Sequence, residues 1–205
     1  MRVYAGAGAV IGWFALALQL VLLVIVDSEI SVAGRIVNFF SYFTILSNIL
    51  AAIALSVVAL GLNGSALGRF FSRRSVQTGI TVYITVTGVI YFLILRTIWD
   101  PEGWALVADS LLHYAMPIIF VGFWLFFVTK GTLAIRNVPW FLAFPMLYAA
   151  YSLVRGPLVA WYPYPFLDAG ALTTGELIVN IAVMLVGFGL VALAYVGLDR
   201  WLARA

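Results

Sequence analysis

The sequence predicts an all-α membrane protein with six transmembrane helices. Of its 205 residues, 65% are hydrophobic and only 9% are charged, whereas a soluble domain carries about 25% charged residues. The apolar residues fall in runs of about 20, the length that crosses a bilayer as a helix. Charged residues collect in the short segments between these runs, so we expect one integral membrane domain over residues 1–205.

The predicted helices follow the apolar runs in order. The first run follows Arg2 and continues to Val26. It is longer than the roughly 7–15 apolar residues of a signal peptide, so we expect it to remain as the first helix. The fifth run is the shortest. The predicted spans are residues 5–26, 38–60, 76–99, 106–128, 139–155 and 176–198.

Basic residues in the short loops predict the topology, because cytoplasmic loops carry an excess of Lys and Arg. One side of the membrane collects most of them, and the acidic residues gather on the other side. Both termini are therefore predicted to be cytoplasmic, in a multi-pass protein of the cell membrane. The basic residues on the predicted cytoplasmic side are Arg2, Arg69, Arg73, Arg74, Lys130, Arg136, Arg200 and Arg204.

Polar residues of several predicted helices share one depth in the outer half of the membrane. In the second helix, Ser41, Thr44 and Asn48 fall on one side, with Ser47 at its margin. Ionisable groups inside a membrane usually face a cavity or a partner, so we expect a polar chamber open to the extracytoplasmic side. Its other candidate residues are Tyr91, Arg96, Asp109, His113, Ser152, Arg155, Glu176 and Asn180.

The only histidine, His113, has informative neighbours along the fourth predicted helix. Asp109 precedes it by four residues, so its carboxylate can reach one ring nitrogen and leave the other pointing inward. Pro117 follows it by four residues and lacks the amide that would bond the His113 carbonyl. The sequence therefore predicts a kink, with space, beside this histidine.

These residue types suit acyl transfer. A hydroxyl is a poor nucleophile until a base takes its proton, and a neutral imidazole is the usual base. Thr44 would be the nucleophile and His113 the base, oriented by Asp109. The candidate donors to the developing oxyanion are Asn48, Tyr91 and Arg96.

Other interpretations remain open. A membrane threonine usually bonds the carbonyl four residues before it, and Arg96 and Arg155 can extend to the headgroups from helix ends. The chamber also suits a non-catalytic lipid-binding or transport protein, or polar residues that only hold helices together. With one histidine and no cysteine, we expect no metal site and no cofactor. We expect no protein partner and, without a basic stripe, no nucleic-acid partner.

Three segments together resemble a known family: residues 40–48 (FSYFTILSN), 111–117 (LLHYAMP) and 164–168 (YPFLD). In order and spacing, nearly the whole chain resembles the six-helix membrane family of the androgen-induced gene product and the androgen-dependent TFPI-regulating protein. The chain is shorter than the animal members and looks like a prokaryotic relative. The resemblance implies a cofactor-independent threonine hydrolase of fatty acid esters of hydroxy fatty acids, with its nucleophile at Thr44 and its histidine at His113.

For such an activity, we expect a fatty acyl ester to enter from the outer leaflet among the membrane lipids. The apolar inner half of the bundle would hold one acyl chain. Ser41, Ser47, Asn48 and Tyr91 would support the reacting pair. The residues expected to bind the polar end of the substrate are Arg96, Arg155, Glu176 and Asn180.

Overall fold

The computed structural model describes residues 1–62 and 64–204, and these residues form helices and loops with no strand. Six helices are long and apolar enough to cross a membrane, which confirms the predicted fold class. The chain divides into two compact units, Met1–Thr129 and Lys130–Ala205. The six candidate spans are Arg2–Ile25, Phe43–Leu60, Arg74–Thr97, Gly103–Phe127, Ile135–Val159 and Thr174–Leu202.

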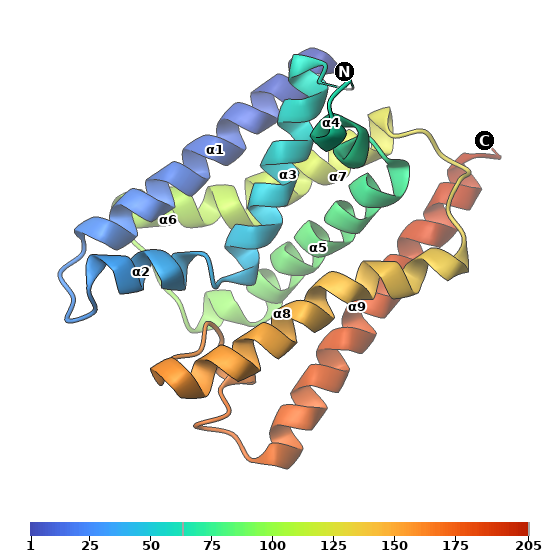
Figure 1. Ribbon diagram of the computed structural model, residues 1–205. Coiled ribbons are helices and arrows are strands. Elements are labelled where there is room, and N and C mark those ends of the chain that lie inside the picture. The colour runs from blue at the N-terminus through green and yellow to red at the C-terminus, as the bar shows by residue number, and fades with distance from the viewer. Residues whose placement is uncertain (63, 205) are drawn as a thin grey trace. The chain divides into compact units, whose positions relative to one another are not determined.

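The first unit contains four of these spans, which pack around one another (Figure 1). Helix α1 (Arg2–Ile25) packs along α3 (Phe43–Leu60), and α3 contacts α5 (Arg74–Leu93). Helix α5 in turn contacts α7 (Met116–Phe127), and α1 closes the arrangement by contacting α7 and α6 (Gly103–Ser110). The polar segments of α3, α5 and α6 therefore face the inside of one four-span unit.

Small residues on α1 allow this close packing, as they do in other membrane bundles. A Cβ on Gly8 would lie 3.0 Å from Leu55 Cδ1 of α3, and one on Gly12 would lie 3.2 Å from Ala52 Cβ. A larger side chain at either position would require the facing side chains of α3 and α7 to move. The buried residues of this face are Ala5, Gly8, Ala9, Gly12, Ala15 and Leu16.

The predicted second helix, residues 38–60, is wrong as a single element. A short helix, α2 (Val32–Phe39), ends before a turn at residues 40–42, and α3 begins at Phe43. Ser41 N–H donates to Asn38 O, and Ser41 Oγ donates to Val37 O at 2.7 Å. These local bonds satisfy the turn, so the apolar run need not continue as helix.

This break changes the position of Thr44. The prediction placed it six residues inside a helix and on the same face as Ser41, and both statements are wrong. Ser41 lies in the turn, whereas Thr44 lies in the first turn of α3. The nucleophile candidate is therefore next to a helix N-terminus, where the helix dipole favours negative charge.

The fourth span is one continuous helical segment, but it is not a uniform α-helix. Between α6 and α7 lies a π-helical turn, η2 (Leu111–Ala115), in which Met116 N–H donates to Leu111 O five residues back. His113 lies in this turn, and Pro117 follows at the start of α7. Where Pro117 predicts a kink with space beside His113, the structure has a π turn, a feature that frequently occurs at functional sites.

The remaining boundaries differ from the prediction mainly in length. Helix α5 ends at Leu93 and is followed by a 3₁₀ turn, η1 (Leu95–Thr97). A short helix, α4 (Ala66–Phe71), connects α3 to α5 and was not predicted. It is too short to produce a periodic signal in the sequence.

The second unit consists mainly of two packed helices, α8 (Val138–Val159) and α9 (Thr174–Leu202). Both are longer than predicted, and α8 continues through Pro145 and Pro157. Near the start of this unit, Leu133 N–H donates to the buried Asp199 Oδ2 at 2.9 Å.

Candidate functional site

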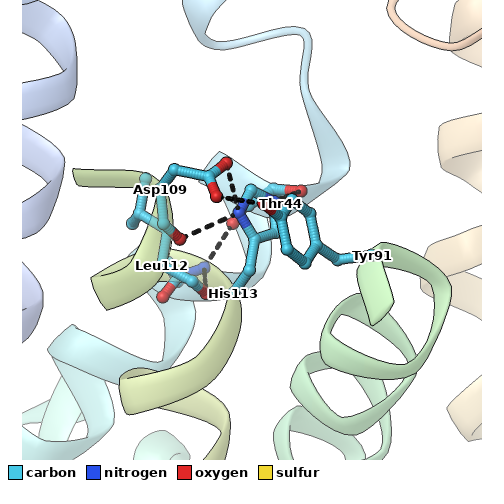
Figure 2. Close-up of polar contacts among 6 residues, drawn as sticks. Thr44, Tyr91, Asp109, Leu112 and His113 are labelled. Carbon is cyan, nitrogen blue, oxygen red and sulfur yellow. Dashed lines mark hydrogen bonds and ion pairs between the residues drawn. The ribbon is translucent and has the colours of Figure 1, made fainter. Parts of the chain in front are cut away.

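Thr44 and His113 lie within hydrogen-bond reach of each other in the first unit. Thr44 Oγ1 is 3.3 Å from His113 Nε2 (Figure 2). The threonine comes from the first turn of α3 and the histidine from the π turn, so tertiary packing joins two segments that are 69 residues apart. Both side chains are largely buried, with 7% of Thr44 and 13% of the His113 side chain exposed. This is the pairing that the sequence predicts.

Asp109 holds the other ring nitrogen, as its spacing predicts. His113 Nδ1 lies 3.1 Å from Asp109 Oδ1 and 3.0 Å from the Asp109 backbone carbonyl. Because both partners are acceptors, Nδ1 carries a proton and donates it. In the neutral ring, Nε2 therefore presents its lone pair to the Thr44 hydroxyl. This is the tautomer that a general base requires.

Tyr91 fixes the plane of the imidazole. Its ring stacks on His113 with centroids 4.0 Å apart and planes inclined by 15° (Figure 2). Its hydroxyl donates to Asp109 Oδ2. Since this hydrogen is already used, the prediction that Tyr91 donates to an oxyanion is wrong. The structure makes Tyr91 a support of both Asp109 and His113 instead.

Asn48 also differs from its predicted role as an oxyanion donor. Its Nδ2 donates to Thr44 O at 2.8 Å and to Leu112 O at 3.2 Å. The two amide hydrogens are thus directed at main-chain carbonyls of α3 and of the π turn. Asn48 is fully buried, and its Oδ1 has no hydrogen-bond partner.

Ser47 contacts the backbone of Thr44 and also the side chain of Thr87, a residue that the sequence analysis missed. Ser47 Oγ lies 3.1 Å from Thr44 O, to which it can donate, and 3.0 Å from Thr87 Oγ1. Thr87 donates to Tyr83 O on its own helix. The available signal was spacing, because Thr87 precedes Tyr91 by four residues and shares its helix face.

Two other predicted residues of the first unit have local partners. Ser41 is buried in the turn before α3, where it bonds Val37 O. Arg96 lies in η1 with its guanidinium carbon 3.7 Å from the centroid of the Phe92 ring. Its side chain is exposed, as expected for an arginine that extends from a helix end.

The remaining predicted residues belong to the second unit, where each has a local contact. Glu176 is exposed and forms a capping box with Thr173, whose amide and hydroxyl both donate to it. This capping contact accounts for the glutamate. Asn180 donates to Phe166 O at 3.1 Å, and Arg155 lies over the Trp161 ring at 5.2 Å.

Within the described part of the chain, no group of three or more His, Cys, Asp or Glu residues is arranged to hold a metal ion. The site consists instead of a hydroxyl, an imidazole, a carboxylate and a phenol. No family model, curated protein or solved structure matches the sequence. The geometry of the site is therefore the main basis for a function.

Proposed function

We propose that this protein is a membrane-embedded lipid ester hydrolase, with Thr44 as nucleophile and His113 as base. One observation carries the proposal: Thr44 Oγ1 lies 3.3 Å from Nε2 of a histidine whose Nδ1 is held by Asp109. Hydrolases that form an acyl-enzyme use the same chain of groups: a nucleophile, a base beside it, and a third group that orients the base.

In the first step, Thr44 Oγ1 attacks the ester carbonyl carbon while its proton passes to His113 Nε2. The imidazolium that forms is stabilised by the Asp109 carboxylate, 3.1 Å from Nδ1. The tetrahedral intermediate then collapses, and the alcohol leaves with the proton from Nε2. A water molecule, activated by the same nitrogen, cleaves the acyl-threonine and releases the carboxylic acid.

Negative charge on the tetrahedral oxygen needs a stabilising group, and Asn48 and Tyr91 use their donors elsewhere. Thr44 lies in the first turn of α3, so the positive end of that helix dipole is beside the reacting carbon. We assign this electrostatic role to the N-terminal turn of α3.

The position of the site supports a lipid substrate. His113 lies near the middle of the 25-residue span Gly103–Phe127, a segment of about 37 Å at 1.5 Å per residue. A substrate must therefore partition into the membrane to reach Nε2. Esters of fatty acids, including those of hydroxy fatty acids, meet this requirement, and the family resemblance implies the same class.

The proposed orientation places the site toward the extracytoplasmic side. The far end of α3 lies beside Arg2, because a Cβ on Gly61 would be 2.7 Å from its guanidinium. Arg2 belongs to the basic end that the positive-inside rule assigns to the cytoplasm. Thr44 is at the opposite end of the same helix.

The test is ester hydrolysis by the purified protein in nanodiscs, with labelling by a fluorophosphonate probe. Thr44→Ala should abolish both, and His113→Ala should lower kcat by at least about 100-fold, the minimum typical of a general base. Thr81→Ala is the matched control, because Thr81 is a buried threonine that bonds Gln77 O in its own helix. Full turnover by a folded Thr44→Ala protein would refute the mechanism.

A further inference from the structure

Resting on this proposed function, we infer that Asn48 is a positioning residue that holds the nucleophile and the base together. It contacts neither substrate nor the reacting atoms in the proposed mechanism. Its amide instead joins the first turn of α3 to the π turn that carries His113.

Pro117 leaves one carbonyl of the π turn without a main-chain donor. In the π turn, the N–H of Met116 reaches five residues back to Leu111 O. The next carbonyl in this register is Leu112 O, and its donor would be residue 117. Proline has no N–H, and a buried carbonyl without a donor is unfavourable. Asn48 Nδ2 supplies this bond from another helix at 3.2 Å.

The other amide hydrogen of Asn48 binds the residue that carries the nucleophile. It goes to Thr44 O at 2.8 Å, so one planar group binds the carbonyl of the nucleophile residue and the carbonyl next to His113. Figure 2 labels Thr44 and Leu112, the two residues whose carbonyls accept these bonds. Because the amide is rigid, it limits how far the two turns can separate. A shift of about 1 Å in such a pair can lower turnover about 100-fold.

The oxygen of the same amide shows that packing does not explain an asparagine at this position. Asn48 Oδ1 is buried without a hydrogen-bond partner, and such a group is unfavourable. Reversing the amide would aim that oxygen at two carbonyls, so the orientation is fixed by its acceptors. A leucine of similar volume would fill the same space without this penalty. The two N–H bonds, rather than packing, therefore account for an amide at this position.

The experiment compares wild type with Asn48→Leu, and uses the single histidine as a reporter. Protein with ¹⁵N-labelled histidine gives signals from His113 alone. In Asn48→Leu, we expect kcat to fall about 100-fold with KM changed less than threefold. We also expect the Nε2 signal to move as its bond from Thr44 is lost. Gln77→Leu replaces another buried amide of this unit and should change neither kcat nor the Nε2 signal.

Pro117→Ala provides a test that is independent of activity. An N–H at residue 117 allows a main-chain donor to reach Leu112 O, so the amide of Asn48 is then needed less. The decrease in Tm caused by Asn48→Leu should therefore be smaller in the Pro117→Ala background. If Asn48→Leu does not fold, the isosteric Asn48→Asp, which lacks both N–H groups, takes its place. Its kcat, its Nε2 signal and its Tm in the two backgrounds are then compared in the same way.

The outcomes separate the two proposals. Wild-type kcat with an unmoved Nε2 signal in Asn48→Leu, or equal Tm decreases in both backgrounds, would overturn the positioning role. If wild type hydrolyses no ester while the Nε2 signal and the Tm coupling behave as expected, the proposed function fails and the positioning role stands.

Discussion

Replacing Asp109 by asparagine tests how the site stabilises a charged imidazole. The substitution keeps the shape of the side chain and removes its charge. In the familiar serine triad, the same change lowers kcat about 10⁴-fold, because the histidine adopts the wrong tautomer. Here the Asp109 backbone carbonyl also accepts from Nδ1, at 3.0 Å, and the substitution leaves it in place. We therefore expect the tautomer to be retained.

What is lost is the interaction between a carboxylate and the imidazolium that forms during the reaction. The Oδ1–Nδ1 distance is 3.1 Å, and the aspartate is buried. A hydrogen bond to a charged group contributes about 1.5–3 kcal/mol. At about 1.4 kcal/mol per tenfold change in rate, kcat should fall roughly 10- to 150-fold.

The assay is hydrolysis of a long-chain fluorogenic ester in nanodiscs, with the tautomer of His113 followed by ¹⁵N NMR. The control is Asp199→Asn, which removes a buried carboxylate of the second unit that accepts from Leu133 N–H. It should lower Tm and leave kcat unchanged. A 10⁴-fold loss with a reversed tautomer, or a loss below threefold, would refute the reasoning on Asp109.

Two further predictions concern packing in each unit. A Cβ in Gly156→Ala would lie 1.9 Å from Tyr162 Cε1, so the ring must move and stability should fall by about 1–3 kcal/mol; Gly187→Ala, where the Cβ meets open space, should show no decrease in Tm. In Trp124→Phe, the bond from the buried Nε1 to Thr78 Oγ1 at 2.8 Å is lost together with side-chain volume. We expect a loss of about 2 kcal/mol in a detergent unfolding titration, and an unchanged midpoint would contradict it.

Sequence reasoning identified the spans because hydrophobic length is a local property that each segment carries by itself. It paired Thr44 with His113 for a chemical reason, since a buried hydroxyl and the only imidazole occur at similar depths. It missed the break before α3 because residues 38–48 contain neither Gly nor Pro to mark it. The bonds of Ser41 that satisfy this turn are visible only in three dimensions.

The roles of Asn48 and Tyr91 were assigned wrongly for a different reason. Both were correctly included among the residues of the site, because their types and positions suit a polar cluster. Which acceptor a donor chooses depends on tertiary placement, and here Leu112 O and Asp109 Oδ2 come from another span. Leu112 contributes only a backbone carbonyl, so no property of its side chain could have indicated it.

The π turn also determines how the two halves of the fourth span face their surroundings. A π turn holds about one residue more than the α-helical turn it replaces, so it absorbs a residue that would otherwise rotate α7 relative to α6 by roughly 100°. Asp109 before the turn and Trp124 after it are both buried. If Leu111–Ala115 became regular α-helix without losing a residue, one of these two faces would turn toward lipid. The π conformation of this segment is therefore what allows both faces to be buried at this chain length.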